Sequence, residues 1–264
     1  MTVYVCSAFG DLRSRDIRLL HAASRYGSVE ALVWSDGATP ADTRFREDER
    51  LYFVRSLRWV ADARLVDTDA TGLPLGVALE RDSVWVCDQA PPRAEVSKRL
   101  AALGLRIVSL GDDDLVALEP TEPPEGAVAD AVIATGCFDW LHSGHIRFFE
   151  EAAAFGRLFV SVGSDATIRG LKGPHHPKIP EKERLYCVAS VRHVHEAFIG
   201  SGTGWLDAAP EIERIRPRRY VVNEDGDRPE KREFCRARGM EYIVLQRRPR
   251  EGLPRRSSTE LRGY

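Results

Sequence analysis

The sequence lacks a strong net charge, a long apolar run and a paired-cysteine pattern. Its 38 Lys and Arg against 40 Asp and Glu leave a net charge of −2, which is not the basic balance of a nucleic-acid-binding chain. No apolar run reaches the length that crosses a bilayer, and the N-terminus shows no signal-peptide pattern. Five scattered cysteines suit reduced thiols. We therefore expect a cytoplasmic protein that binds neither nucleic acid nor membrane.

Two stretches of the chain occur twice, in the same order. Residues 9–36 align without gaps on residues 138–165, and ten of these 28 pairs are identical. Residues 47–63 align on residues 181–197, with ten identities in 17. The offset between the copies grows from 129 to 134 because the second half has a longer loop around Lys172. A period this long indicates two duplicated domains, not an array of short repeats.

The two copies predict two domains of one fold, residues 1–118 and 129–264, joined by a Pro- and Glu-rich linker at 119–128. Each half begins with a short apolar run, a turn and a helical pattern. Alternating strands and helices predict two tandem doubly wound, Rossmann-like α/β domains. In the second half we expect strands at 131–135, 158–163, 197–199, 220–222 and 242–245, and helices at 145–152, 181–194 and 229–238.

Residues 136–145 read GCFDWLHSGH and lie where the first strand of the second half enters a helix. Ligand sites of open parallel sheets lie beyond the carboxyl ends of the strands, and a helix N-terminus offers free N–H groups to phosphate. His142 and His145 are three residues apart and share one helix face. Gly144 lets a phosphate approach the backbone. The segment therefore predicts a phosphate-binding site.

The first copy has lost the two histidines and the second glycine of this segment. At the positions of His142, Gly144 and His145 it carries Arg13, Arg15 and Asp16, and it has no equivalent of Lys172. The first copy thus keeps the residues expected to support the fold and lacks those expected to take part in chemistry. We interpret the N-terminal half as a degenerate, non-catalytic domain.

The segment 136–145 resembles the signature of the HxGH nucleotidyltransferases, in particular their cytidylyltransferase-like branch. Further segments resemble that family in the same order: residues 163–165, the lysine segment 168–174, and residues 183–184, 192–194, 223–225 and 256–262. The resemblance implies transfer of a nucleoside monophosphate from a nucleoside triphosphate, with CTP as the expected donor, to a small phosphate- or phosphonate-bearing acceptor. Pyrophosphate would leave, and Mg²⁺ would bridge the phosphates.

The resemblance also implies roles for individual residues. His142 and His145 would bind the donor phosphates, and Lys172 would bring charge to them from a mobile loop. Arg184 would bind the acceptor, together with Lys172. No protein ligand to a metal is expected. The nucleotide would be held by Gly136, Cys137, Phe138, Asp139, Gly163, Asp165, Asn223, Asp225, Ser257, Ser258 and Thr259.

Several alternatives stay open. Arg184 and Asp165 persist in the first copy as Arg50 and Asp36, which gives a structural role about equal weight. Residues 257–259 could serve only as a helix N-cap. The lysine segment resembles that of heptose adenylyltransferases, so ATP with a sugar phosphate acceptor is the alternative pair of substrates. The remaining alternative is a protein that binds or senses nucleotide without turnover.

Both copies keep a similar segment, residues 56–60 and 190–194, in the region through which members of this family dimerise. Duplication and fusion would convert a two-fold dimer contact into a contact within one chain. We therefore predict a pseudo-dimer of the two halves, with Trp59 in the contact, either as a monomer or as a homodimer.

Overall fold

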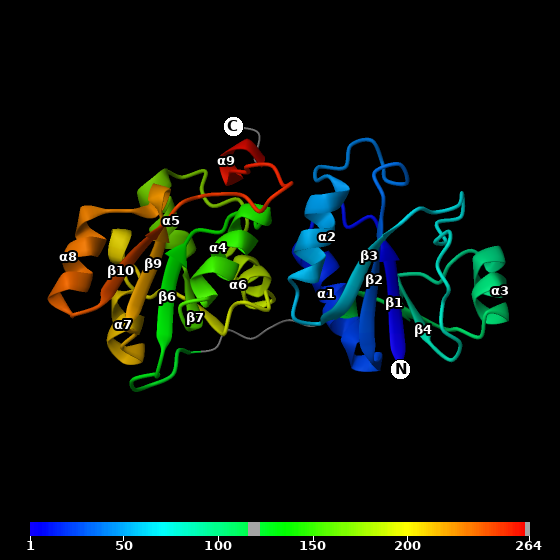
Figure 1. Cartoon of the computed structure of the whole chain (residues 1–264), viewed down its shortest axis with the longest axis horizontal. Coiled ribbons are helices and arrows are strands. Elements are labelled where there is room, and N and C mark those ends of the chain that lie inside the picture. The colour runs from blue at the N-terminus through cyan, green and yellow to red at the C-terminus, as the bar shows by residue number, and fades with distance from the viewer. Residues whose placement is uncertain (116–121, 262–264) are drawn as a thin grey trace. The chain divides into compact units, whose positions relative to one another are not determined.

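The computed structural model describes residues 1–115 and 122–261 of the chain. The chain forms two compact units, Met1–Ala117 and Leu118–Tyr264, each built on one sheet (Figure 1). Part of the predicted linker, 119–121, lies outside the described residues.

The sheet of the first unit has five parallel strands in the order β3-β2-β1-β4-β5. The strands are β1 (Thr2–Ser7), β2 (Ser28–Trp34), β3 (Val60–Val66), β4 (Val84–Asp88) and β5 (Arg106–Leu110). The helices between them are α1 (Ser14–Ala23), α2 (Glu47–Arg55) and α3 (Ala94–Ala102).

The sheet of the second unit repeats this topology, in the order β10-β9-β6-β7-β8. Its parallel strands are β6 (Ala131–Gly136), β7 (Arg157–Val162), β8 (Glu196–Ile199), β9 (Arg219–Asn223) and β10 (Glu241–Leu245). In both units the first strand is central, with the second and third on one side and the fourth and fifth on the other. The predicted pair of doubly wound α/β domains is confirmed. The pseudo-dimer stays a prediction.

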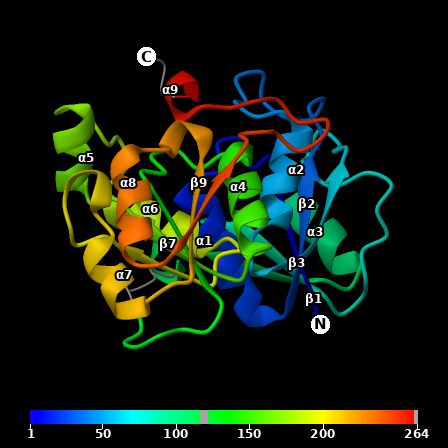
Figure 2. The same ribbon diagram turned by 60° about the vertical axis from the view of Figure 1, so that its left-hand side comes forward.

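Helices cover both faces of the second sheet. They are α4 (Ser143–Ala153), α5 (Asp165–Lys172), α6 (Glu181–Ala189), α7 (Ala209–Ile215), α8 (Pro229–Ala237) and the short α9 (Ser258–Leu261). Figures 1 and 2 show α7 and α8 on one face of the strands and α4 and α6 on the other. Ile133, Phe159 and Tyr220 of the sheet pack against Ile212 and Phe234 on the α7–α8 face.

The copies share backbone conformations that few residues adopt. Phe9 and Phe138 follow the first strand of each unit with φ of 49° and 51°, a region that bulky side chains rarely enter. Gly27 and Gly156 have φ of 150° and 147°. A Cβ on Gly156 would lie 2.1 Å from the carbonyl oxygen of Asp130, so this turn requires glycine. The repeat is therefore a repeat of backbone geometry as well as of sequence.

The helix predicted over residues 181–194 is shorter than expected, because α6 ends at Ala189. The Ser190 hydroxyl donates to the Tyr186 carbonyl at 2.6 Å, and Val191 and Val194 turn into the core. A serine that hydrogen-bonds its own helix backbone weakens continuation of the helix. The first copy ends in a similar way, where the Ser56 hydroxyl donates to the Phe53 carbonyl.

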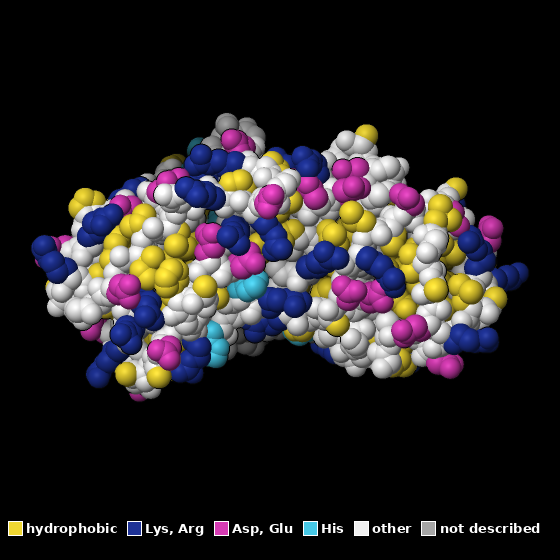
Figure 3. All heavy atoms as spheres, in the orientation of Figure 1, with side chains coloured by type: hydrophobic (Ala, Val, Ile, Leu, Met, Phe, Trp, Pro, Cys, Tyr) yellow, Lys and Arg dark blue, Asp and Glu magenta, His cyan; other side chains and the backbone are white. Residues whose placement is uncertain are grey.

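The surface carries both signs of charge. Figure 3 shows basic and acidic side chains interspersed over the visible face, as the net charge of −2 leads one to expect. Within the described residues, no helix is both long enough and apolar enough to cross a membrane. All five cysteines are free.

Candidate functional site

A cavity of about 310 Å³ opens at the carboxyl ends of β6 and β9, where open α/β sheets bind ligands. Its volume lies at the lower end of the range for small-molecule sites. The predicted signature supplies much of the lining, and α5, α8 and the segment after β8 supply most of the rest. The predicted site residues in the lining are Gly136, Cys137, Phe138, Asp139, His142, His145, Lys172, Asn223, Asp225, Ser257 and Ser258.

His142 is both the N-cap of α4 and part of the cavity wall. Its Nδ1 accepts a hydrogen bond from the Gly144 backbone N–H at 3.1 Å. A Cβ on Gly144 would lie 3.0 Å from Cε1 of this ring, so the glycine makes room for the imidazole. The rings of His142 and His145 stack with centroids 3.9 Å apart. Gly144 therefore makes room for the side chain of His142.

The two imidazoles present unsatisfied nitrogens. His142 Nε2 and His145 Nδ1 are buried and have no hydrogen-bond partner among the described residues. Burial, followed by the charges of His145 and two arginines, holds the pKa of His142 well below its usual range. Burial, Arg247 and Lys172 lower the pKa of His145 to about 3. Both rings are therefore neutral near pH 7. Because Nδ1 of His142 accepts a hydrogen bond, its Nε2 carries the proton and can donate to an anion.

Lys172 lies at the end of a helix, so the prediction that a loop carries this residue is wrong. The segment from Asp165 to Lys172 forms α5, capped by the Ser164 hydroxyl, which accepts from the Thr167 N–H at 3.1 Å. Gly173, with φ of 96°, ends the helix. Lys172 is exposed and lines the cavity. In the first unit residues 35–46 form no helix and contain no lysine.

Arg184 lies beneath the site and does not line the cavity, so its predicted contact with the acceptor is corrected. The guanidinium side chain is 0% exposed. Nε donates to the Ile179 carbonyl at 2.8 Å, and Nη1 donates to the Cys137 carbonyl at 2.6 Å. Nη2 donates to the Gly163 carbonyl and to Asp165 Oδ1, both at 2.8 Å. Arg184 is a positioning residue that ties three segments of the site together.

The first unit contains the same arrangement around Arg50. Its Nε donates to the Phe45 carbonyl at 3.0 Å, Nη1 donates to the Ala8 carbonyl, and Nη2 pairs with Asp36 Oδ1 at 2.8 Å. Phe45, Ala8 and Asp36 align with Ile179, Cys137 and Asp165. A residue kept with its partners in both copies serves the fold, which accounts for its survival in the half that lacks equivalents of His142 and His145.

Asp165 and Gly163 make structural contacts, and their predicted contacts with nucleotide stay a prediction. Neither residue lines the cavity. The Asp165 carboxylate pairs with Arg184, and its backbone N–H donates to Glu181 Oε2 at 2.6 Å. A Cβ on Gly163 would lie 2.8 Å from Ile168 Cδ1, so the glycine serves packing.

Asp139 orders the segment that follows α5. Its Oδ1 accepts from the backbone N–H groups of Lys178 and Ile179 at 2.7 and 2.9 Å. The side chain is buried and borders the cavity. Gly10 occupies the equivalent position in the first unit and offers no carboxylate.

The serines of the closing motif combine capping with a place in the cavity wall. The Ser257 hydroxyl accepts from the Glu260 N–H, and Glu260 Oε2 accepts from the Ser257 N–H, both at 3.2 Å. This reciprocal pair is a capping box for α9. Ser257 and Ser258 also line the cavity. The side chain of Thr259 lies outside the described residues.

Arg228, Lys231 and Arg247 line the cavity and were not predicted from the sequence. Arg247 Nη1 pairs with Asp225 at 2.8 Å, and its charge acts on both histidines. The sequences of α8 and of the segment after β10 show no pattern that distinguishes a basic residue facing the cavity from a basic residue on the surface. The position of Arg247, two residues after β10, is the only hint available from sequence.

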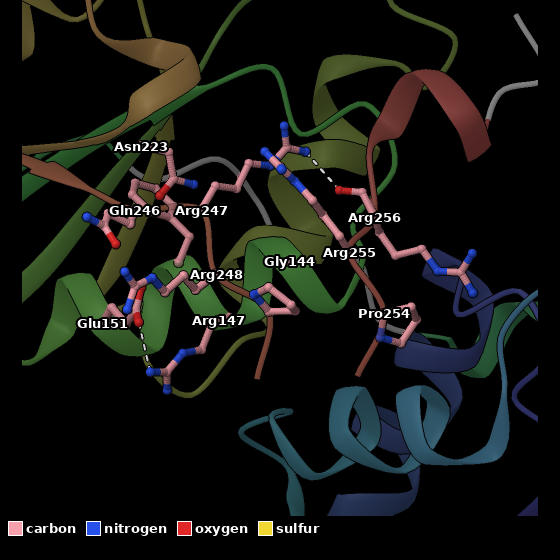
Figure 4. A pocket seen from close by; sticks show the side chains of 12 residues that line it. Gly144, Arg147, Glu151, Asn223, Gln246, Arg247, Arg248, Pro254, Arg255 and Arg256 are labelled. Atoms are coloured by element: carbon pink, nitrogen blue, oxygen red, sulfur yellow. Dashed lines mark hydrogen bonds and ion pairs between the residues drawn. The ribbon is translucent and has the colours of Figure 1, made fainter. Parts of the chain in front are cut away.

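An arginine-rich groove borders the cavity and shares Gly144, Phe148, Asn223 and Arg247 with it. Figure 4 shows Arg147 paired with Glu151 and Arg247 donating to the Arg256 carbonyl. The other arginines of the groove are Arg248 and Arg255. The arginine cluster after β10 therefore lies beside the cavity that His142 and His145 line.

The first unit uses the equivalent positions for structure. Arg15, at the position of Gly144, pairs with Asp88 and Asp112, each at 2.7 Å. Asp16, at the position of His145, accepts from the Arg13 N–H at 3.2 Å and caps α1. These residues cannot reproduce a stacked pair of imidazoles, which agrees with the interpretation of a degenerate half.

Comparison with known proteins places the second unit in a family. Residues 133–263 match the family described as Cytidylyltransferase-like. An FAD synthase of Methanothermobacter marburgensis is 38% identical over 119 residues, which cover 43% of this chain and 71% of that protein. The bifunctional protein HldE of Photobacterium profundum is 36% identical over 115 residues, covering 34% of this chain and only 24% of HldE.

Solved structures also resemble the chain. One of them is the crystal structure of the lipopolysaccharide core biosynthesis protein from Thermoplasma volcanium, with 26% identity and a TM-score of 0.39. The match covers 46% of this chain and 98% of that one.

Proposed function

Since the chain belongs to the cytidylyltransferase-like family of nucleotidyltransferases, we propose that it transfers a nucleoside monophosphate from a nucleoside triphosphate to a small phosphate- or phosphonate-bearing acceptor. The observation that carries the proposal is the pair of buried, unpartnered imidazole nitrogens of His142 and His145 in a cavity lined by cations. Buried polar atoms without partners are rare and need a ligand or another explanation. Phosphate oxygens are acceptors of the right charge.

The reaction needs no protein nucleophile. An oxygen of the acceptor attacks the α-phosphorus of the donor, a new P–O bond forms, and the bond from the α-phosphorus to the bridging oxygen breaks, releasing pyrophosphate. Negative charge grows on the leaving phosphates, and pre-positioned donors stabilise it. His142 and His145 would face these phosphates. Lys172, at the end of α5, would bridge donor and acceptor, and Arg247 would lead the leaving group toward the arginine-rich groove.

Mg²⁺ is the proposed metal, and it would arrive with the donor phosphates. The described residues hold no cluster of three or more potential metal ligands. Mg²⁺ in phosphate sites needs only one or two carboxylates beside the phosphates and water. Asp225 lines the cavity with its side chain 56% exposed, and could supply one ligand. The ion would neutralise charge on the phosphates.

CTP is the donor proposed from the sequence, and ATP is the second candidate. The similarity to proteins named FAD synthase favours ATP, because FAD contains an adenosine monophosphate unit. HldE and the heptose-like lysine segment point to a sugar phosphate as the matching acceptor. A nucleotide-binding protein without turnover would bind a donor and release no pyrophosphate.

The test is pyrophosphate release from each of four nucleoside triphosphates against a panel of phosphate and phosphonate acceptors. His142→Ala and His145→Ala should each lower kcat by about 10²–10³, the effect of removing one donor to a developing charge. Arg13→Ala, at the position equivalent to His142 in the first unit, is the matched control and should leave kcat unchanged. Unchanged release in both histidine variants would overturn the assignment of the site.

A further inference from the structure

Lys231 places a buried ammonium group at the wall of the cavity. The residue is only 6% exposed although it lies in the first turn of α8. Its Nζ donates to the Thr135 hydroxyl at 3.2 Å and lies 5.5 Å from the centroid of the Tyr220 ring. Among the described residues, no carboxylate lies within 4.0 Å of this nitrogen. Two of its three N–H groups therefore have no protein acceptor in the described part of the chain.

The fold itself does not require a cation at this position. Helices α3 and α8 are equivalent nine-residue helices of the two units, and the third residue of α3 is Val96. Val96 is 5% exposed, so an apolar side chain fills the same buried place in the first unit. Burying an ammonium group is costly unless an opposite charge compensates it. Burial accordingly lowers the pKa of Lys231.

A second cation and an aromatic ring lie in the same part of the wall. The Arg228 guanidinium lies 4.5 Å from the centroid of the Trp205 ring, and both residues line the cavity. Within the described residues, Arg228 likewise has no carboxylate within 4.0 Å. The charge of Asp207 acts favourably on Lys231, although the two groups form no ion pair. The end of the cavity near α8 thus carries two cations, and neither forms an ion pair with Asp207 or with Asp225, which pairs with Arg247 instead.

These cations are separate from the groups assigned to the donor phosphates. His142 caps α4 and His145 lies in its first turn, and α4 covers the other face of the sheet from α8 (Figure 1). A nucleobase or a ribose hydroxyl is neutral and would not compensate a buried ammonium group. The charge balance therefore calls for an anionic group at this end of the cavity.

We propose that Lys231 and Arg228 form a second anion-binding site, and that the acceptor carries a carboxylate in addition to the phosphate or phosphonate that attacks the donor. This inference rests on the proposed function. The attacking group would lie toward Lys172 and the histidines, and the carboxylate toward α8. The acceptor class is then a small phosphorylated or phosphonate-bearing carboxylic acid.

The test uses pairs of acceptors that differ by one carboxylate: phosphoserine against phosphoethanolamine, and 3-phosphoglycerate against glycerol 3-phosphate. Pyrophosphate release gives kcat and KM for each, and calorimetric binding of each acceptor to the full chain gives a second readout that needs no turnover. The wild type should prefer the carboxylate-bearing member of at least one pair by tenfold or more. Lys231→Met should remove that preference through KM, by about 10- to 100-fold, the value of a charged hydrogen bond.

Arg228→Met is the second variant, in case Lys231→Met does not fold, and it should reduce the same preference. Arg236→Met on the exposed face of α8 is the matched control and should change nothing. A wild type that binds and uses both members of each pair equally overturns the inference. So does a Lys231→Met variant that weakens both members equally. Selective binding of the carboxylate-bearing acceptor without pyrophosphate release would support the anion site and count against the proposed function.

Discussion

Replacing Arg184 by methionine should destabilise the second unit without removing any group that touches a substrate. Methionine fills much of the space of the aliphatic stem, but it leaves Asp165 and the carbonyl groups of Cys137, Gly163 and Ile179 without their shared donor. Breaking a buried charge pair by removing one partner costs about 3–5 kcal/mol, and each unsatisfied buried group costs about 1–3 kcal/mol. The Asp165 side chain is 26% exposed, so water can partly replace its partner.

We therefore expect a loss of about 3 kcal/mol in the free energy of unfolding, toward the lower end of that range. A domain with a total stability of about 5–15 kcal/mol would remain folded, but its unfolding midpoint would fall clearly. Arg184→Lys should not rescue it, because one ammonium group cannot serve four acceptors arranged around a planar fork.

The assay is denaturant unfolding of the full chain, with Arg50→Met as the matched variant in the first unit. Each unit should lose a similar amount of stability, because the two arginines have equivalent partners. Two units need not unfold together, so the transitions should be fitted separately. Arg50→Met should leave the cavity residues in place. An Arg184→Met variant with an unchanged midpoint and a raised KM for the acceptor would refute this reasoning and restore a direct contact.

Four further outcomes are expected. Lys172→Ala should lower kcat more than it raises KM in steady-state kinetics, because its charge acts on the developing negative charge; a raised KM alone would assign it to ground-state binding. In the full chain, His142→Ala combined with His145→Ala should leave no detectable pyrophosphate release, since the first unit has Arg13 and Asp16 instead. As pH falls from 6.5 toward 3, the unfolded chain takes up a proton at His145 that the folded chain does not, so stability should fall by up to about 1.4 kcal/mol per pH unit; His145→Asn should flatten that slope in thermal unfolding. If the halves form a pseudo-dimer, Trp59→Asp should lower activity from the other unit, and unchanged activity and stability would count against it.

The sheets could be predicted because parallel strands buried on both faces appear as apolar runs. The expected strand at 131–135 is β6, and that at 158–163 is β7 shifted by one residue. The end of α6 was missed because Ser190 and Val191 continue the helical spacing of apolar residues, while the serine hydroxyl and core packing favour a turn. Pattern alone does not resolve that competition.

Site residues could be predicted from sequence where they follow the end of a strand. They could not be predicted where the role of a residue depends on whether the fold buries it. His142 and His145 line the cavity as expected. In sequence, Arg184 resembles a ligand-binding arginine and Lys231 resembles an exposed helix charge. Both side chains are buried by residues that are remote in sequence. Cys137 and Gly163 contact Arg184, and Thr135 and Tyr220 contact Lys231.

The duplication supplies a comparison within one molecule that separates these two kinds of residue. A position kept in both copies with the same partners, such as Arg50 and Arg184, is constrained by the fold. A position that carries different residues with different contacts in the two copies, such as His145 and Asp16, is not constrained by the fold in this way. Lys231 belongs to the second kind, because Val96 fills its place in the first unit. Because the fold accepts valine at this position, the buried charge of Lys231 is not needed for folding. The comparison that gives Arg184 a structural role therefore gives Lys231 a role in binding the ligand.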